Sequence, residues 1–472
     1  MYDVASFARS AGIAALLACI LVPPAVAQEN LIFDFSSPRK FAGLGIELWP
    51  ATDHQTERDT LLHDLHVRFV RVGFTTNLTD EQLKNHMSVA ALLAAITKAA
   101  DDNQTAVYSR LHDEIDRLHV GLDLAFWQVP SVWCIGDSDS VVSHTRINPD
   151  HIPDYANWIV AHLLYAKRLR LLPRTIEMIN EPDTTTSTEF TPEQYDSLLF
   201  ALRATLDRNG LTAVGIAGPG VGSAATVEAY TQVLERTGHI SLLTKLSWHD
   251  MDTARRPEPA GFAGVPLGLL AAAHGLPIAI TEFSSLSPQW DRLPYDSGPQ
   301  ARGENNAADS SDFAVSVVAE TIKLIADGAN SLCYWHVEDS TFTQDAFGLL
   351  NENGERKPAA AALQMFSEHI PQNCDVTGPK QQTFGLAAVC LRSDHGLILA
   401  TANLSQVARK IDARILNTIP PAKLTLGRRF DSHGPTPQVV PASEIVFSGP
   451  NVSFDIPARS VMVLLLSKRG SL

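Results

Sequence analysis

Two glutamates, Glu181 and Glu282, each follow a short apolar run typical of a buried strand. Pro182 comes directly after Glu181 and cannot extend a sheet ladder, so a strand ends there. A carboxyl group at the end of an apolar strand is costly to bury unless it is paired or opens onto a cleft. Two such carboxyl groups facing one cleft can protonate a leaving oxygen and attack an anomeric carbon, which is the chemistry of glycosidic bond cleavage. Their spacing alone leaves open that both are solvated acids at strand ends.

The elements that would position these glutamates alternate between strand and helix. Apolar runs that are hydrophobic on both faces, as in buried parallel strands, are separated by longer segments with helical periodicity. Eight such units over roughly 330 residues predict a (β/α)8 TIM barrel, whose reactive groups lie where the strands end. A doubly wound sheet would need a glycine-rich phosphate loop after an early strand, and none is present. The expected strands are Phe41–Leu48, Val67–Phe74, Val120–Trp127, Thr175–Ile179, Val214–Ala217, Leu243–Trp248, Leu276–Thr281 and Ser331–Trp335.

The pattern changes from about residue 372, where short β-rich runs alternate with turn residues and helical periodicity disappears. This predicts a second domain, an antiparallel β-sandwich over residues 371–472, after a catalytic barrel over residues 28–370. The run Leu31–Phe35 precedes the barrel strands and is a candidate strand of the sandwich.

Residues 1–27 have the features of a secretory signal peptide. Arg9 precedes an apolar run, and Ala25-Val26-Ala27 supplies small residues at the cleavage positions. We therefore expect an exported protein, periplasmic or extracellular, with no membrane span in the mature chain. Two alternatives remain open: a lipid anchor at Cys19, or retention of the apolar run as an uncleaved anchor.

The amino-acid composition restricts the classes of ligand and partner that we expect this chain to bind. Acidic residues exceed basic residues by 52 − 37 = 15 in 472 residues, and no Lys/Arg-rich run occurs, so nucleic acid is a poor candidate and a neutral or cationic ligand fits better. Of the five cysteines, Cys374 and Cys390 lie close together in the β-rich region, which makes a disulfide between them plausible in an exported protein. No cysteine or histidine motif indicates a metal, and we expect neither metal nor organic cofactor.

The Asn180-Glu181-Pro182 run at the fourth strand, with Glu282 after Thr281 at the seventh, resembles glycoside hydrolase clan A, the retaining (β/α)8 glycosidases. The resemblance implies that Glu181 is the acid/base, that Glu282 is the nucleophile and that Asn180 donates a hydrogen bond to the sugar 2-hydroxyl. The implied ligand is a carbohydrate, cleaved without a cofactor.

Further positions agree with this resemblance. It implies that Arg71 supports the nucleophile, that His249 lies beside it and that Trp335 stacks on the bound sugar. A guanidinium next to Glu282 is expected to keep that group ionised while Glu181 stays protonated. Further candidates near strand ends are Trp49, Trp127 and Trp133 as sugar platforms and Glu47 as a subsite acid.

Within the clan, the Asn-Glu-Pro-Asp run and the segments Asp345–Leu350 and Gly354–Ala359 resemble family 39, with families 30 and 79 as alternatives. Phe283 after the nucleophile and the run His249-Asp250-Met251 depart from the family 39 pattern, which puts the substrate in doubt more than the mechanism. The prediction is a hydrolase acting on an exopolysaccharide, xylan-type or glucan-type chain. The competing hypotheses are a transglycosylase and a non-catalytic carbohydrate-binding or cell-wall protein on a decayed barrel.

Overall fold

The computed structural model describes residues 27–467, apart from 49–53, 74–77, 84, 101, 128, 137–144, 185–187, 223, 225, 251–273, 286–306, 340–346, 382 and 395. The signal-peptide prediction and Cys19 lie outside the described residues, except for Ala27, the first residue of strand β1. Within the described residues, no helix combines the length and the apolar character needed to cross a membrane.

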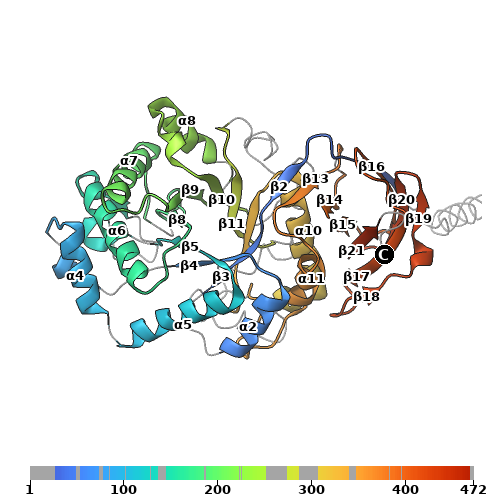
Figure 1. Cartoon of the computed structure of the whole chain (residues 1–472), viewed down its shortest axis with the longest axis horizontal. Coiled ribbons are helices and arrows are strands. Elements are labelled where there is room, and N and C mark those ends of the chain that lie inside the picture. The colour runs from blue at the N-terminus through green and yellow to red at the C-terminus, as the bar shows by residue number, and fades with distance from the viewer. Residues whose placement is uncertain are drawn as a thin grey trace, which may run out of the picture.

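Eight parallel strands close into a barrel, which confirms the predicted fold class (Figure 1). Each neighbouring pair around the ring is parallel, so all eight strands end on the same side, where their loops converge. The strands are β3 (Gly43–Leu48), β4 (Phe69–Gly73), β5 (Gly121–Ala125), β8 (Thr175–Glu177), β9 (Gly215–Val221), β10 (Lys245–Asp250), β11 (Ile278–Phe283) and β12 (Ser331–Tyr334).

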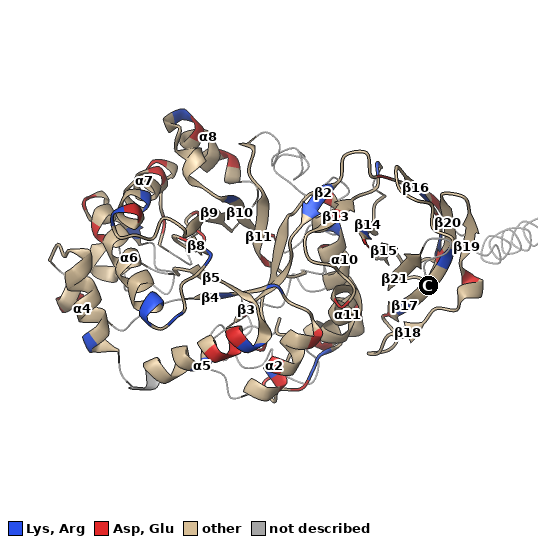
Figure 2. Cartoon of the chain, viewed as in Figure 1, with Lys and Arg blue, Asp and Glu red and all other residues tan. Residues whose placement is uncertain are grey.

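Helices surround the barrel, and several begin with a side-chain cap. Thr191 and Gln194 form a reciprocal capping box at the start of α7, which satisfies two otherwise unpaired backbone N–H groups. Along α2, α7 and α8 both signs of charge are interspersed (Figure 2). The helices are α2 (Gln55–Asp64), α3 (Asp80–Leu83), α4 (Val89–Ala99), α5 (Asp102–Leu118), α6 (Ile152–Arg168), α7 (Pro192–Arg208), α8 (Val227–Thr237), α10 (Ser311–Asp327) and α11 (Pro358–Ser367).

Two further sheets form the second region. In the larger sheet the order is β18-β17-β21-β15-β14-β13-β2, and in the smaller it is β1-β16-β20-β19. All strand pairs in these two sheets are antiparallel except β1 with β16. The run Leu31–Phe35 lies largely within β1, and therefore in the smaller sheet as predicted. The strands are β1 (Ala27–Asp34), β2 (Arg39–Phe41), β13 (Cys374–Thr377), β14 (Leu386–Ser393), β15 (Gly396–Asn403), β16 (Arg409–Leu416), β17 (Lys423–Asp431), β18 (Gln438–Val439), β19 (Val446–Ser448), β20 (Asn451–Ile456) and β21 (Ser460–Ser467); β6 (Cys134–Ile135) and β7 (Arg146–Ile147) pair separately.

The larger sheet is covered on both faces. One face packs on the barrel core through α10, a helix whose residues 313–327 are all buried because the barrel and β14–β15 enclose it (Figure 1). The other face forms a separate apolar core with the smaller sheet, which includes Leu399, Phe454 and Leu464. The second region is therefore fused to the barrel over a broad surface rather than tethered to it.

The predicted Cys374–Cys390 disulfide is wrong, because both residues are free thiols. Cys390 pairs with Thr377, which is three positions along β13 from Cys374, an odd offset. Side chains alternate across a sheet, and the two cysteines therefore point to opposite faces. Cys374 packs in the barrel-side core and Cys390 in the core between the sheets.

Candidate active site

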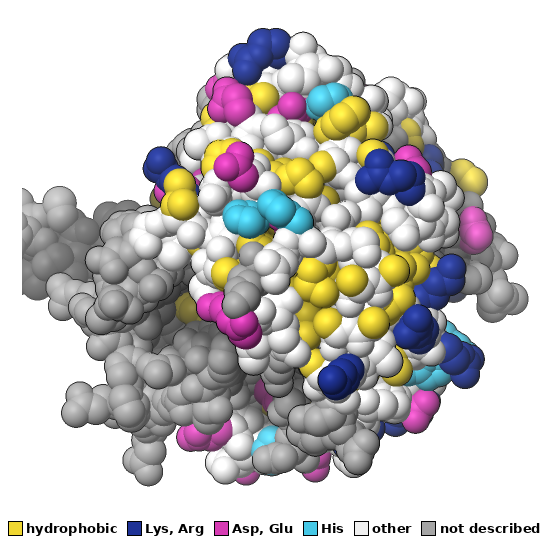
Figure 3. Space-filling view, turned by 90° about the vertical axis from the view of Figure 1, so that its left-hand side faces the viewer, with side chains coloured by type: hydrophobic (Ala, Val, Ile, Leu, Met, Phe, Trp, Pro, Cys, Tyr) yellow, Lys and Arg dark blue, Asp and Glu magenta, His cyan; other side chains and the backbone are white. Residues whose placement is uncertain are grey.

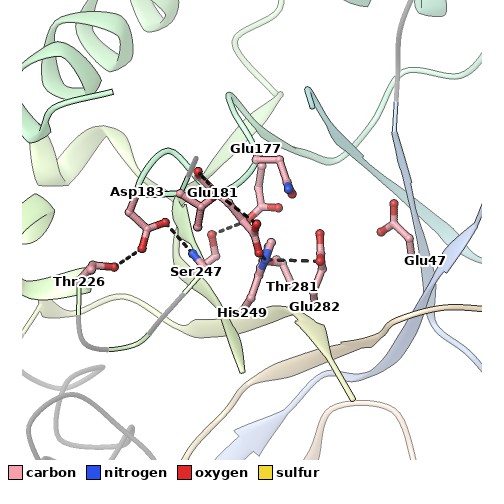
Figure 4. A network of polar contacts seen from close by, with 12 residues as sticks. Glu47, Glu177, Glu181, Asp183, Thr226, Ser247, His249, Thr281 and Glu282 are labelled. Carbon is pink, nitrogen blue, oxygen red and sulfur yellow. Dashed lines mark hydrogen bonds and ion pairs between the residues drawn. The ribbon is translucent and has the colours of Figure 1, made fainter. Parts of the chain in front are cut away.

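The turn after β8 presents Asn180 and Glu181 to the barrel mouth. The Asn180 backbone N–H donates to Phe126 O (2.9 Å) and that of Glu181 to Gly220 O (3.0 Å), which ties the turn to the neighbouring loops. Glu181 has φ of 44°, in the left-handed region that side-chain-bearing residues rarely adopt. Asp183 accepts hydrogen bonds from Gly222 N (2.8 Å) and Thr226 Oγ1 (2.5 Å), and so anchors this turn to the loop after β9 (Figure 4).

Arg71 on β4 is the hub of the site. Its side chain is 1% exposed, and its Nη1 donates to Glu282 Oε1 at 2.6 Å and to Glu47 Oε2 at 2.8 Å. Its Nε donates to Glu177 Oε2 at 3.0 Å, and its Nη2 donates to Asn180 Oδ1 at 2.8 Å. One guanidinium therefore connects residues from β3, β8, β11 and the turn after β8, which holds their side chains in a common arrangement.

Glu177 is a site residue that sequence reasoning missed. Its Oε1 accepts hydrogen bonds from Ser247 Oγ (2.6 Å) and Thr281 Oγ1 (2.7 Å), while its Oε2 binds Arg71. Burial opposes ionisation of this carboxyl group, but the charges of Arg71 and His249 and the two hydroxyl donors outweigh burial and lower the pKa of Glu177. The sequence feature that could have identified it is an acidic residue inside the short strand before Asn180, together with hydroxyl-bearing residues inside two other barrel strands.

His249, at the end region of β10, lies between the two candidate catalytic glutamates (Figure 4). Its Nδ1 is 2.8 Å from Glu181 Oε1 and 3.4 Å from Glu282 Oε2. Burial alone lowers the pKa of this imidazole, but the carboxylates of Glu282 and Glu181 raise it to about 9. The site therefore holds a second cation, placed directly against Glu181.

The pKa values of the two glutamates are shifted in directions opposite to those expected. Burial raises the pKa of Glu282, and its contacts with His249 and Arg71 offset that effect only in part. Burial also acts on Glu181, but the hydrogen bond and charge of His249 outweigh it and lower the pKa of Glu181. The expectation of an ionised Glu282 beside a protonated Glu181 overlooked two facts: Arg71 is shared among several acceptors, and His249 pairs with Glu181.

Glu47, at the end of β3, is fully buried at 0% exposure. Burial raises the pKa of Glu47 to about 8, although Arg71 opposes this shift. Its Oε2 binds Arg71, whereas its Oε1 has no hydrogen-bond partner among the described residues. Glu47 thus lies within the polar cluster rather than on an exposed subsite wall.

The aromatic candidates separate into two groups. Trp335 follows β12 and Trp127 follows β5, and their ring centroids are 5.4 Å apart with the planes at 37°. The Arg71 Cζ atom is 5.9 Å from the Trp127 ring, so this aromatic pair adjoins the polar cluster. Trp133, by contrast, is buried in the core and donates Nε1–H to Leu83 O at 3.0 Å, which removes it as a sugar platform. Trp49 lies outside the described residues.

Metal-compatible donors occur in two places among the described residues. Donor atoms of Glu181, His249 and Glu282 all lie within 4.8 Å of one another, as do those of His86, His151 and Asp154. The first set is explained by the ion pairs just described. The second lies outside the barrel mouth and is considered separately below.

The sequence matches no protein-family model, and no curated protein matches it. Solved structures do match along nearly the whole chain. A glycoside hydrolase family 30 subfamily 8 xylanase from Clostridium acetobutylicum superposes with a TM-score of 0.67 at 14% identity, covering 93% of this chain and 99% of that one. A family 39 glycoside hydrolase from Bacteroides cellulosilyticus gives 0.60 at 11% identity, covering 90% and 81%. A monomeric β-xylosidase from Caulobacter crescentus gives 0.55 at 15% identity, covering 94% and 100%.

At these identities the likeness shows the fold alone. The structural neighbours are clan A glycoside hydrolases, and the closed barrel with an added β region is the architecture they share with this chain. The resemblance to that clan is thus confirmed for the fold, with families 30 and 39 both among the neighbours.

Proposed function

We propose that this chain is a retaining glycoside hydrolase that cleaves β-glycosidic bonds of a polysaccharide or oligosaccharide by double displacement. The proposal is carried by one observation: a carboxylate oxygen of Glu181 and one of Glu282 lie within 4.8 Å of each other at the barrel mouth. Retaining glycosidases separate their two carboxyl groups by about 5–5.5 Å, whereas inverting enzymes leave about 6.5–9.5 Å for a water molecule. The close spacing supports a mechanism in which one glutamate attacks the sugar directly.

In the first step the Glu282 carboxylate attacks the anomeric carbon as Glu181 protonates the departing glycosidic oxygen. In the second step Glu181 takes a proton from water, the water oxygen attacks the same carbon and Glu282 leaves as a carboxylate. The proton that Glu181 needs is close by, since His249 Nδ1 lies 2.8 Å from its Oε1. Arg71, 2.6 Å from Glu282, favours the ionised nucleophile and stabilises it again as the intermediate breaks down.

The surrounding residues suit a sugar. Asn180 Oδ1 is occupied by Arg71, so its Nδ2 group is the part of the amide that remains to donate to a sugar hydroxyl. The indole of Trp335 or Trp127 offers an apolar face on which sugar C–H groups pack. Neighbours by fold include a xylanase, a β-xylosidase and an endo-β-1,6-glucanase, so these linkages form the first substrate panel. The acidic net charge and the predicted secretory signal peptide favour a neutral or cationic polymer met outside the cytoplasm.

The test measures reducing-sugar release from β-linked xylans and glucans and from aryl xylosides and glucosides. Glu282→Gln should lower turnover by about 10⁴-fold or more, because the covalent step loses its nucleophile. Glu181→Gln should keep part of the activity on aryl glycosides with good leaving groups, which do not need protonation. Full activity in both variants would reject the assignment of roles.

Two other functions predict different results on the same panel. A carbohydrate-binding protein on a decayed barrel would bind oligosaccharides without releasing sugar from any of them. A transglycosylase uses the same two glutamates but transfers the sugar to an acceptor, so its products lengthen as acceptor concentration rises. Product analysis by mass distinguishes that outcome from hydrolysis.

A further inference from the structure

A second cluster of ionisable side chains lies outside the barrel mouth. His86, between α3 and α4, and His151, directly before α6, both approach the first-turn residue Asp154 of α6. Their Nδ1 atoms are 2.6 Å and 2.8 Å from the same oxygen, Asp154 Oδ2. Asp154 is only 4% exposed, so its carboxyl group is directed at the two imidazoles rather than at solvent.

The loop that carries His86 is fixed on both sides of it. Trp133 Nε1 donates to Leu83 O at 3.0 Å, and Asn157 Nδ2 donates to Met87 O at 3.2 Å. The His86 and His151 rings are stacked with centroids 5.3 Å apart, and the Trp133 ring stacks on His151 at 6.3 Å. The three donors are therefore held together by their surroundings as well as by their mutual hydrogen bonds.

Two imidazoles and one carboxylate are a ligand set typical of zinc, with a fourth position for water. Bonds of about 2.0–2.2 Å in a tetrahedral site place neighbouring ligand atoms roughly 3.3 Å apart. The three donor atoms already lie within 4.8 Å of one another, and an ion needs the two Nδ1–Oδ2 contacts to open by about 0.5–0.7 Å. The side chain of His86 is 74% exposed, which leaves a path for the ion.

From this arrangement we infer that His86, His151 and Asp154 form a binding site for a divalent transition metal such as Zn²⁺. Figure 3 shows histidine side chains exposed in the middle of the face that carries α4 and α6. The ion would join the loop before α4 to the first turn of α6. Such a site could not be predicted from the sequence, because 68 positions separate His86 from Asp154.

The chain contains a matched control. His239 Nδ1 lies 2.8 Å from Asp196 Oδ1, a similar imidazole–carboxylate contact, but Thr237 instead of a second histidine completes the set. This pair has the hydrogen bond without the metal-binding geometry. His239→Ala therefore separates loss of a histidine contact from loss of a metal ligand.

The experiment titrates the chelator-treated, dialysed full chain with ZnCl₂ by calorimetry at pH 7.5. We expect one ion per chain at this site and a higher thermal midpoint in zinc. His86→Ala and His151→Ala should each weaken this binding by about tenfold or more, whereas His239→Ala leaves it unchanged.

Three results would overturn the inference: no zinc binding, unchanged binding in both cluster variants, or loss of the ion in His249→Ala instead. The last result would assign the ion to the barrel mouth. Circular dichroism of each variant without metal checks that it is folded; His86 is exposed, so its substitution should leave the fold intact. None of these readouts depends on the proposed glycosidase activity, so the two proposals succeed or fail separately.

Discussion

Arg58 and Arg71 are both buried, at 4% and 1% exposure, yet they lie in different regions and have different partners. Arg58, on α2, binds Glu114 of α5 through two hydrogen bonds of 3.1 Å and 3.2 Å, one guanidinium to one carboxylate. Arg71, at the barrel mouth, faces three carboxyl groups and an amide. The outer pair is balanced in charge, whereas the barrel mouth holds more acid than its arginine can neutralise.

The difference separates a pair that connects two helices from a cluster suited to the proposed chemistry. In the outer pair one guanidinium meets one carboxylate. An excess of buried acid costs stability unless some carboxyl groups keep their protons, and it leaves groups whose protonation changes near neutral pH. Burial raises the pKa values of Glu47 and Glu282, and neighbouring carboxylates add to both shifts. The carboxylates of Glu282 and Glu181 raise the pKa of His249. In the outer pair burial, with a contribution from Asp59, raises the pKa of Glu114 to about 7, although Arg58 opposes this shift.

The largest expected effect comes from removing each arginine. Arg71→Met and Arg58→Met each leave buried carboxyl groups without a cation and should lower the free energy of unfolding by about 3–5 kcal/mol. Only Arg71→Met should also lower kcat/KM, by about 10²–10³-fold, because Glu282 loses its hydrogen-bond donor. Urea unfolding and steady-state kinetics on both variants measure this; an equal loss of activity in folded Arg58→Met would remove the distinction.

Next in size is the effect of the carboxyl partners. Glu177→Gln removes the charge that holds Arg71 Nε and weakens the hydrogen bonds from Ser247 and Thr281. Because misplacement of a catalytic group by about 1 Å costs about 10²-fold, we expect kcat to fall by about 10- to 100-fold with little change in KM. Glu114→Gln is the matched control in the outer pair and should alter the unfolding midpoint but not kcat. A change confined to KM would mean that Glu177 acts on binding instead.

His249→Gln should change the pH profile. In the unchanged chain the pKa of His249 is raised to about 9, so the His249–Glu181 pair keeps its proton up to that pH. Without the imidazole, Glu181 alone must hold the catalytic proton, and the alkaline limb of kcat/KM should move from near pH 9 to lower pH. An alkaline limb that stays in place would show that another group stores the proton.

The barrel could be predicted because its strands are apolar on both faces and are separated by helical segments, and all eight expected runs coincide with barrel strands. Helix α2 is harder to predict: it buries only Leu61 and Leu62 beside Arg58, so its apolar pattern is weak.

The residues of the candidate site could be predicted from the sequence, but the contacts between their side chains could not. Glu181, Asn180 and Glu282 stand at strand ends, where position and residue type suffice. The sharing of Arg71 and the contact between His249 and Glu181 arise only when strands distant in sequence meet. The pKa values of Glu181 and Glu282 depend on those contacts, and for that reason the directions of their shifts could not be predicted from the sequence.

The smallest effect, and the most specific to the excess of acid, is expected for Glu47→Gln. The pKa of Glu47 is raised from an ordinary value of 4.5 to about 8, so the folded chain binds more protons than the unfolded chain between these values. Its stabilising contribution is therefore fully present below about pH 4.5 and is lost as the pH rises through about 8. Glutamine has nearly the same shape and its amide oxygen can still accept from Arg71 Nη1, but it cannot ionise. Urea unfolding between pH 5 and pH 8 should accordingly give a free energy that falls less with pH in Glu47→Gln than in the unchanged chain. An unaltered slope would mean that Glu47 is ionised throughout, and the comparison with the balanced Arg58–Glu114 pair would then rest on Glu282 and His249 alone.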